Sequence, residues 1–432
     1  MKSLWKLPAI IFFYLFMAPA LHAQQTPPLE RIWFAFNQVI DVTAYRGMNF
    51  RLESMAKVEP GADSLAKMTM WARVDLVKGR GFFDNMGNRP VTSSKWTKCI
   101  IEGKIDSAAV DLYVGGLCYY TGNFYYDNFK LTVQTPAGWK LIPLNNAGFE
   151  KPGNDRWFPG VKKGIVQKVK GFETSYLKEN KTNSVYKITG TNIPAYGQDK
   201  TKGSYFSTNG VTLYYEVYGK GEPLLLLHGN GQSIRDFYRQ IPFFEKDYQV
   251  IVPDCRGRGK STINDDELTY HIEASDINNL LDHLQIDSAN IIGWSDGGII
   301  GLIMAMDYPK KVKRLVASGA NVLQDSTSFF PTDFPKYKKI VDDTSKPMIT
   351  RRLYKLMLDH PNIPVKELGK IQCPVLVVAG DKDEILVGHT ISIFEAIPKG
   401  QLFIAPKSTH YLLSENPKVF NEAAAKFFKE IE

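Results

Sequence analysis

The chain has 432 residues, more than one hydrophobic core usually serves, so about two domains are expected. Its four cysteines are too few for a disulfide scaffold, and their spacing matches no zinc pattern. The formal net charge of +8 is uneven, because residues 24–203 carry 25 Lys/Arg against 16 Asp/Glu while residues 204–432 carry 26 against 29. The positive charges are scattered except for one short cluster at 162–170, which favours a solvated face over a nucleic-acid site.

The first residues have the three-part pattern of a secretory signal peptide. Lys2 and Lys6 precede an apolar run over 7–21, and Ala23 follows as a small residue suited to cleavage. An uncleaved anchor is the alternative, but the run contains two prolines and is shorter than the roughly 20 residues of a spanning helix. We expect residues 1–23 to be removed and the protein to be secreted or periplasmic, with no membrane span.

Residues 24–147 are expected to form a β-sandwich or jelly roll. Short runs rich in Val, Phe, Tyr and Trp are separated by Gly, Asn, Asp and Pro, and several alternate apolar with polar side chains as half-buried strands do. Through the stretches 73–75, 81–86 and 125–129, this half resembles the galactose-binding-like jelly rolls of carbohydrate-binding modules. The resemblance implies a glycan as a second partner.

Exposed aromatic side chains grip the faces of sugars, so Trp33, Trp71, Trp96 and Tyr119 are candidates for such a platform, although most aromatics in strands are core. Cys99 and Cys118 could pair in an oxidising compartment, or be small buried hydrophobes. Residues 148–203 are rich in Gly, Asn and Lys, and either extend the β domain or link it to the next.

From residue 204 to 432 apolar strands alternate with amphipathic helices. This pattern predicts an α/β domain with a mostly parallel sheet and helices on both faces. The expected strands are 211–218, 224–227, 248–252, 289–292, 315–317, 375–378 and 402–404.

A GxSxG stretch at 293–297 follows one of these strands and opens a helix. Glycines on either side let the backbone turn sharply and push the Ser295 hydroxyl into a cleft, so Ser295 is the expected nucleophile. A serine needs backbone amides to hold the oxyanion that forms on attack. The amide of Asp296, at the start of the helix, and that of Asn230, in the His228–Gly231 loop after the leucine strand, are the candidates.

The remaining catalytic groups are expected further along the chain. Asp383 follows the strand at 375–378, and His410 follows the last strand, so both reach the same edge of the sheet. Asp381 is the competing acid, but the order Ser295, Asp383, His410 is that of a Ser-acid-His triad. Residues of about 321–369 lie over this edge as a short cap, whose apolar side chains either line a pocket or pack on the sheet.

Together with Asp254–Ser261, which fits the pattern DxRGxGxS, these motifs resemble the α/β-hydrolase superfamily over residues 204–432. The stretch GWSDGG, followed later by Ser318–Asn321, is similar to the biphenyl hydrolase-like group, which includes valacyclovir hydrolase. That resemblance implies that the Asp296 carboxylate binds a cationic ester, with Trp294 as a further candidate substrate-binding residue.

We therefore expect an exported serine hydrolase that cleaves a small carboxylic ester through an acyl-enzyme, with neither metal nor organic cofactor. Lactonase, amidase, carbon–carbon hydrolase and cofactor-free haloperoxidase activities are alternatives on the same triad. A surface-associated glycan-binding protein with an idle hydrolase fold is the alternative from another class.

Overall fold

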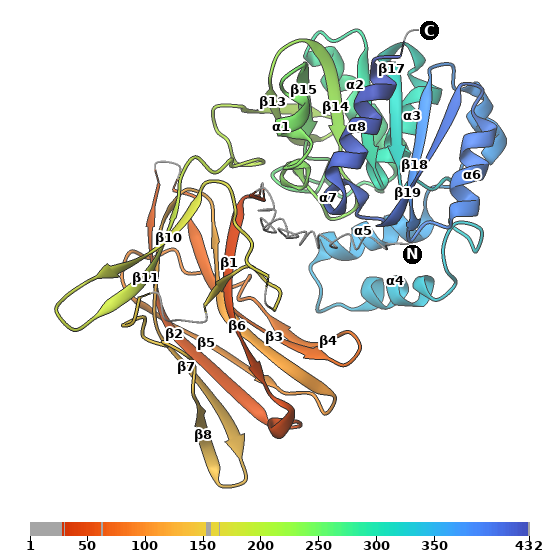
Figure 1. Cartoon of the computed structure of the whole chain (residues 1–432). Coiled ribbons are helices and arrows are strands. Elements are labelled where there is room, and N and C mark those ends of the chain that lie inside the picture. Colours follow the sequence, from red (N-terminus) through yellow and green to blue (C-terminus); the bar gives the residue numbers. More distant parts are fainter. Residues whose placement is uncertain (1–27, 30, 62–63, 153–156, 164, 431–432) are drawn as a thin grey trace, which may run out of the picture.

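The computed structural model describes residues 28–29, 31–61, 64–152, 157–163 and 165–430. The predicted signal peptide lies outside these residues. Within them the chain forms a β-rich half followed by an α/β half (Figure 1). No helix in this part of the chain is long and apolar enough to cross a membrane.

The β-rich half consists of two antiparallel sheets, in the strand orders β4-β3-β6-β1-β9 and β10-β11-β7-β2-β5, with β8 paired to β7. The strands of the first sheet are β1 (Trp33–Asp41), β3 (Lys67–Leu76), β4 (Arg80–Asp84), β6 (Ala109–Tyr119) and β9 (Phe158–Pro159). Those of the second are β2 (Asn49–Pro60), β5 (Thr97–Lys104), β7 (Gly122–Thr135), β8 (Gly138–Ile142), β10 (Phe172–Lys178) and β11 (Ser184–Gly190), and a 3-10 turn, η1 (Thr43–Tyr45), follows β1.

Side-chain alternation explains how the two sheets pack. On β2 every second residue is buried, and Phe50, Leu52 and Val58 share one core with Phe36 and Val114 of the opposite sheet. An all-β first half is thus confirmed. Residues 148–203 were expected either to extend the β domain or to link it to the next, and they do both. Strands β9 to β11 add to the two sheets, and residues 191–202 form the connection to the α/β half.

The four aromatic residues predicted to bind a sugar do not form one continuous exposed surface. Trp71 is buried and donates its indole N–H to the carbonyl of Phe36 at 3.2 Å, so it belongs to the core. The Trp33 and Trp96 rings are covered by Arg31 and Lys57, and Tyr119 lies beside Lys67. Glycan binding by this half stays a prediction.

Cys99, Cys118 and Cys255 are buried, and Cys373 is half-buried. All four are free thiols, so Cys99 and Cys118 do not pair. Burial raises the pKa of Cys99 to about 11, which keeps it protonated and unreactive.

The α/β half is built on an eight-stranded sheet in the order β12-β13-β15-β14-β16-β17-β18-β19, parallel from β15 to β19. Its strands are β12 (Gly203–Thr208), β13 (Val211–Tyr218), β14 (Glu222–Leu227), β15 (Tyr248–Pro253), β16 (Ala289–Trp294), β17 (Val312–Ser318), β18 (Val375–Lys382) and β19 (Gly400–Thr409). The helices are α1 (Ile241–Phe244), α2 (Tyr270–His283), α3 (Asp296–Asp307), α4 (Asp333–Asp342), α5 (Met348–Asp359), α6 (Val387–Ala396), α7 (Leu412–Glu415) and α8 (Pro417–Phe428), with 3-10 turns η2 (Ile234–Phe237), η3 (Pro309–Lys311) and η4 (Val365–Lys370).

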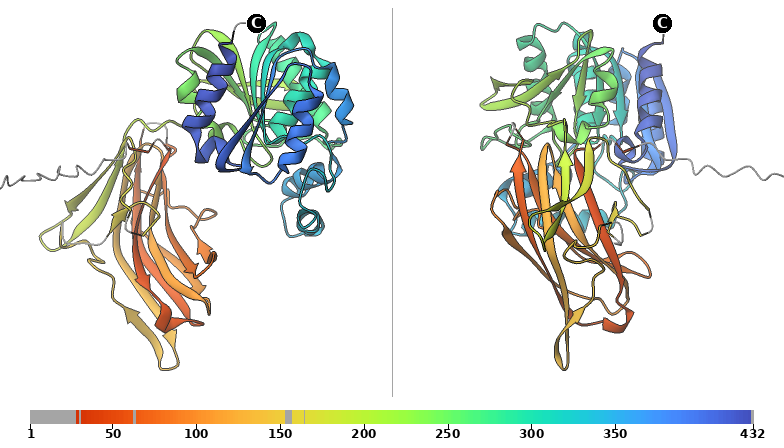
Figure 2. Two further views of the ribbon diagram at one scale, coloured as in Figure 1. Left: turned by 45° about the vertical axis from the view of Figure 1, so that its right-hand side comes forward. Right: turned by 60° about the vertical axis from the view of Figure 1, so that its left-hand side comes forward.

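Helices cover both faces of this sheet (Figures 1 and 2). On the leucine strand β14, Leu225 and Leu227 pack with α2, α3 and α6, whereas Leu224 and Leu226 pack with α1, α7 and α8 on the other face. Burial on both faces is why the strands are continuous apolar runs. The predicted strands all occur, and α4 and α5 project from the sheet as the predicted cap (Figure 2).

Glu216 of β13 fixes the connection between the halves. Its fully buried carboxylate accepts hydrogen bonds from the backbone N–H of Gly197 at 2.7 Å and of Asp199 at 2.9 Å. The hydroxyls of Tyr214 and Tyr218 donate to the same carboxylate at 2.7 and 2.6 Å. Four donors hold the acid, so the connection enters the α/β half in one conformation.

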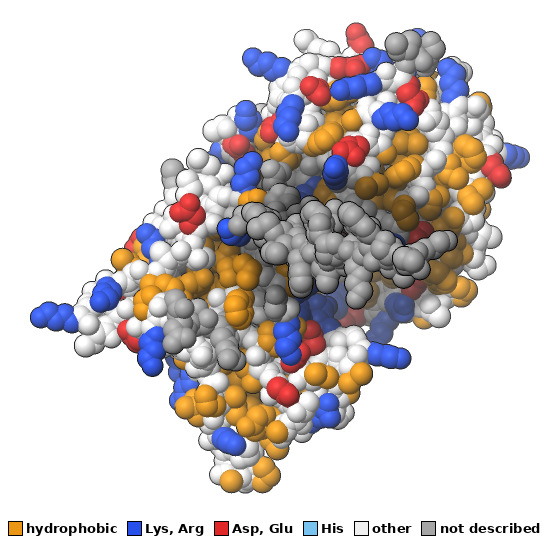
Figure 3. Space-filling view, in the orientation of Figure 1, with side chains coloured by type: hydrophobic (Ala, Val, Ile, Leu, Met, Phe, Trp, Pro, Cys, Tyr) orange, Lys and Arg blue, Asp and Glu red, His pale blue; other side chains and the backbone are white. Residues whose placement is uncertain are grey.

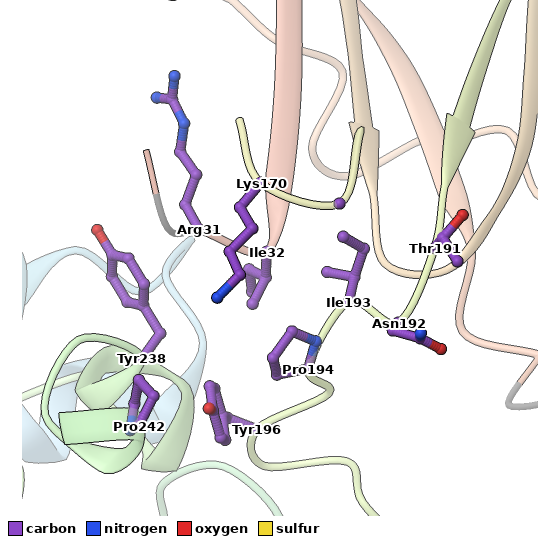
Figure 4. Close-up of a pocket in the computed structure, with 11 residues that line it drawn as sticks. Arg31, Ile32, Lys170, Thr191, Asn192, Ile193, Pro194, Tyr196, Tyr238 and Pro242 are labelled. Atoms are coloured by element: carbon purple, nitrogen blue, oxygen red, sulfur yellow. The ribbon is translucent and has the colours of Figure 1, made fainter. Parts of the chain in front are cut away.

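The two halves also meet along an apolar seam. Tyr196 of the connection lies beside Tyr238 and Pro242 of the α/β half, with Ile32 and Pro194 next to them (Figure 4). A cavity of about 350 Å³ remains within this seam. Ile32 is a residue of the β-rich half that packs against the core of the α/β half.

Candidate active site

Ser295 lies at the turn from β16 to α3, with φ 56° and ψ −118°. A non-glycine residue in this region is strained, and the surrounding packing must hold it there. The flanking glycines allow it: a Cβ at Gly293 would lie 2.2 Å from the carbonyl oxygen of Gly297, and one at Gly297 would lie 2.0 Å from that of Leu227. The GxSxG pattern thus reflects backbone packed on backbone on both sides of the serine.

The structure brings Ser295, His410 and Asp383 together. His410 Nε2 is 2.9 Å from Ser295 Oγ, and His410 Nδ1 is 2.7 Å from Asp383 Oδ1. The same Asp383 oxygen accepts the backbone N–H of Ile385 at 3.0 Å. The competing acid, Asp381, is exposed and accepts the backbone N–H of Ser408 instead.

The electrostatics suit a general base. Burial of His410 opposes its protonated form, but the hydrogen bond and charge of Asp383, with smaller contributions from Glu384 and Asp296, outweigh it and raise the pKa of His410 above its ordinary value. Gly319 makes room for the imidazole, because a Cβ there would lie 2.8 Å from His410 Cε1.

The backbone N–H groups of Asn230 and Asp296, the two predicted oxyanion donors, have no hydrogen-bond partner among the described residues. The Asp296 N–H is the first of α3, where the helix dipole favours negative charge. Gly229 brings the Asn230 loop close to the nucleophile, since a Cβ on Gly229 would lie 2.9 Å from Ser295 Cβ. Both predicted oxyanion donors therefore flank Ser295.

His228 stabilises the loop that contains Asn230 and takes no part in the triad. Its Nε2 accepts the backbone N–H of Cys255 at 3.0 Å, which leaves the proton on Nδ1, 2.9 Å from the carbonyl of Gly229. Complete burial lowers the pKa of His228 to about 3, so the ring stays neutral. This structural role was not predicted, although the position of His228 directly after β14 was a usable signal.

The Asp296 side chain lies in a buried network. Its carboxylate accepts hydrogen bonds from Arg258 at 2.8 Å, Tyr270 at 2.9 Å and Asn230 Nδ2 at 3.2 Å, and Arg258 also pairs with Glu273. Burial raises the pKa of Asp296, opposed by Arg258. The charge is already compensated, and the side chain does not line the active-site cavity, so this arrangement gives no support to a role in binding a substrate ammonium.

Trp294, the other candidate substrate-binding residue, is also buried. Its indole N–H donates to the backbone carbonyl of His410 at 2.8 Å. In this structure Trp294 positions the loop that carries the base.

A cavity of about 590 Å³ opens above the triad. Ser295 and His410 form its floor with the 229–232 loop, and the cap contributes Tyr337, Tyr354 and Met357. The cavity is also lined by charged side chains that were not predicted as site residues, namely Asp236, Asp333, Lys336 and Glu384. Other cap aromatics lie elsewhere: Phe329 is buried and Phe330 is half exposed.

A mostly parallel sheet with a strained serine between strand and helix, a histidine and acid from later strands, and backbone amides beside the serine together define a hydrolase of the α/β-hydrolase fold. The family model described as "alpha/beta hydrolase fold" matches residues 222–346.

Two relatives named as hydrolases each match about half of this chain. The human "Serine hydrolase BPHL" is 29% identical over 259 residues, covering 54% of this chain and 89% of that protein. The Comamonas testosteroni "2-hydroxy-6-oxononadienedioate/2-hydroxy-6-oxononatrienedioate hydrolase" is 26% identical over 252 residues, covering 48% of this chain and 88% of that protein. A solved Pseudomonas aeruginosa PA01 hydrolase, 21% identical, covers 54% of this chain and 100% of its own with a TM-score of 0.48. The C-terminal half has the α/β-hydrolase fold, and the protein is a hydrolase.

Proposed function

We propose that this protein is an exported serine hydrolase that cleaves small carboxylic esters through an acyl-enzyme. The observation that carries the proposal is the continuous chain of hydrogen bonds from Ser295 through His410 to Asp383, beside two free backbone donors. The relatives named serine hydrolase and hydrolase support the same chemistry.

The geometry suggests the following sequence of steps. His410 Nε2 accepts the hydroxyl proton of Ser295 as Oγ attacks the ester carbonyl, and the resulting oxyanion accepts the N–H groups of Asn230 and Asp296. The ester C–O bond then breaks, and His410 returns the proton to the leaving alkoxide. Water, deprotonated by His410, cleaves the acyl-enzyme and restores Ser295. Asp383 keeps the Nδ1 proton in place and stabilises the imidazolium.

The cavity limits the substrate to a small molecule. Its volume of about 590 Å³ is within the range of small-ligand sites, and its lining is mixed, with aromatic side chains from the cap and several charged side chains. Lactones, amides and carbon–carbon bonds next to a ketone are alternative substrates for the same triad, so they belong in the same assay panel.

The test is covalent labelling combined with that panel. Wild-type protein is expected to react with a fluorophosphonate probe at Ser295 and to hydrolyse short aryl esters, whereas Ser295→Ala does neither. Peptide mapping identifies the labelled residue. Turnover by wild type no greater than by Ser295→Ala, with no labelling, would refute the proposal.

Export is part of this proposal and rests on the sequence pattern of residues 1–23. The full-length chain, expressed in a bacterium with a secretory pathway, is expected in the periplasm or medium with Gln24 as its first residue. Mass spectrometry of the intact protein and fractionation of the cells check both points. A cytosolic protein that retains residues 1–23 would contradict it.

A further inference from the structure

A second cavity near the active site has walls from both halves of the protein. Its volume is about 420 Å³. The β-rich half contributes Leu65, Lys67 and Tyr120, and the α/β half contributes Gly231 to Ser233, Arg235, Asp254 and Gly259, while Tyr196 to Gln198 of the connection close it. This cavity is therefore formed jointly by the β-rich half, the connection and the α/β half.

Two cationic side chains line this cavity from opposite sides. Lys67 begins β3, and Arg235 lies in η2. Burial, and secondly the nearby Arg235 guanidinium, lower the pKa of Lys67. Among the described residues no carboxylate forms an ion pair with Lys67, and the one beside Arg235, Asp236, is 3.8 Å away. Two like charges that face one cavity without full compensation favour an anion between them.

The acids near this cavity are already engaged. Asp254 accepts the backbone N–H groups of Ile234 at 2.9 Å and Lys260 at 2.8 Å. Asp236 accepts the backbone N–H of Ser233 at 2.9 Å. Lys260, the other nearby cation, lies over the ring of Tyr214 at 4.1 Å. Lys67 and Arg235 are therefore the cations that line this cavity, and Lys67 Nζ also lies 5.4 Å from the ring centroid of Tyr119.

This cavity adjoins the active site. Gly231 and Gln232 line both it and the cavity above the triad. They directly follow Asn230, whose N–H is a proposed oxyanion donor, and Gln232 Oε1 accepts the N–H of Gly229 at 2.7 Å. This loop is therefore a shared wall of the two cavities, and a substrate that reacts at Ser295 would have to extend past it to reach Lys67 and Arg235. Figure 3 shows Lys and Arg side chains in the recess between the two halves.

We propose that the cavity between Lys67 and Arg235 binds an anionic group of the substrate, a carboxylate or a sulfate, so that the β-rich half takes part in selecting esters. This inference rests on the proposed function. It assigns Lys67 and Arg235 as specificity-determining residues and gives the β-rich half a role in catalytic selectivity that needs no glycan.

The experiment compares matched esters. Two series of aryl esters are assayed, one with a terminal carboxylate or sulfonate on acyl chains of increasing length, the other with the same group on the alcohol side. Each is paired with a neutral ester of the same size. The measured quantity is the ratio of kcat/KM for the anionic ester to kcat/KM for its neutral partner.

In at least one series the wild-type ratio is expected to rise at the length that reaches the cavity. At that length Lys67→Gln/Arg235→Gln lowers the ratio about tenfold, which corresponds to about 1.4 kcal/mol. The control Lys130→Gln/Arg80→Gln removes the same charge from exposed positions of the β-rich half that line neither cavity, and it keeps the wild-type ratio. Raising the salt concentration from about 20 mM to about 500 mM also lowers the wild-type ratio, because salt screens the attraction.

The outcomes separate the two proposals. If neutral esters are hydrolysed and Ser295 is labelled, but neither series gives a ratio that depends on salt or on Lys67 and Arg235, the anion site is refuted and the serine hydrolase stands. If no ester is hydrolysed and Ser295 is not labelled, the proposed function itself fails. Where the double variant does not fold, the single variants Lys67→Gln and Arg235→Gln decide the matter by the same ratio: a lower ratio supports the site, and a wild-type ratio in both refutes it.

Discussion

Trp294 and His410 are joined by a hydrogen bond from the indole N–H to the backbone carbonyl, 2.8 Å long. The two residues are 116 positions apart in the sequence. Trp294 directly precedes the nucleophile Ser295, and His410 is the proposed base. The buried indole thereby ties the end of β16 to the loop after β19.

Trp294→Phe removes this donor and keeps most of the apolar volume. Losing a hydrogen bond of about 1 kcal/mol that positions the base is expected to lower kcat/KM about fivefold. Steady-state kinetics on a neutral aryl ester measure the effect. Trp139→Phe is the control, because Trp139 is 47% exposed on β8. Equal kcat/KM for the two variants would show that Trp294 does not position His410.

Asp383 and Asp381 allow a matched test of the acid. Asp383→Asn removes the partner of His410 Nδ1, and a triad without its carboxylate loses on the order of 10³ to 10⁴ in kcat. Asp381→Asn changes an exposed side chain that accepts the backbone N–H of Ser408 and does not contact His410, so kcat is expected to stay within about twofold of wild type. A larger loss in Asp381→Asn than in Asp383→Asn would transfer the role to Asp381.

The pH dependence of kcat/KM reports the base. His410 acts in its neutral form, so activity falls as the pH drops through its pKa, which lies above the ordinary value of about 6.5. Glu384 is one of the groups that raise this pKa. Glu384→Gln is therefore expected to move the acidic limb of the profile to lower pH. Glu395→Gln, an exposed change on α6, leaves the limb in place. An acidic limb at the wild-type pH in Glu384→Gln would contradict this account.

Two glycine substitutions test the elbow. A Cβ at Gly297 would lie 2.0 Å from the Leu227 carbonyl oxygen, so Gly297→Ala must push α3 away from β14. A shift of about 1 Å at the nucleophile costs about 100-fold in kcat/KM. Gly388 of α6 has nothing within 4 Å of such a Cβ, so Gly388→Ala is expected to be neutral or to stabilise by up to about 1 kcal/mol. Full activity of Gly297→Ala would mean that the elbow tolerates a side chain.

The sequence predicted the features that depend on local patterns. Strands such as β14 are apolar runs, and Ser295 is marked by glycines that the backbone itself requires. A β-rich half followed by an α/β-hydrolase half was predicted on these grounds, and it is confirmed. Asp383 and His410 were predictable because each follows an apolar strand and because the order Ser295, Asp383, His410 is that of a Ser-acid-His triad.

Features that depend on contacts between distant segments were beyond prediction. Asp296 looked available to a substrate because its partners, Arg258 and Tyr270, come from a loop and a helix whose packing no local pattern encodes. The cavity between Lys67 and Arg235 depends on how two domains meet, which neither domain's periodicity records.

Glu216 decides how firmly the two halves are joined. Each carboxylate oxygen accepts one backbone N–H from the connection and one tyrosine hydroxyl. Burial, followed by Glu216 itself, raises the pKa of Tyr214 and of Tyr218, so both hydroxyls remain donors. Glu216→Gln keeps one acceptor oxygen and points an NH₂ group at two donors. The expected loss is about 2 to 3 kcal/mol in the free energy of unfolding.

Chemical denaturation measures that loss, and limited proteolysis shows where the chain loosens. Cleavage of Glu216→Gln is expected within residues 191–202, whereas Glu267→Gln, an exposed change, behaves as wild type. Because Gly197 packs against the backbone of Arg235, the loosened connection should also lower the anionic-to-neutral kcat/KM ratio. Wild-type stability and cleavage in Glu216→Gln would show that other contacts hold the two halves together.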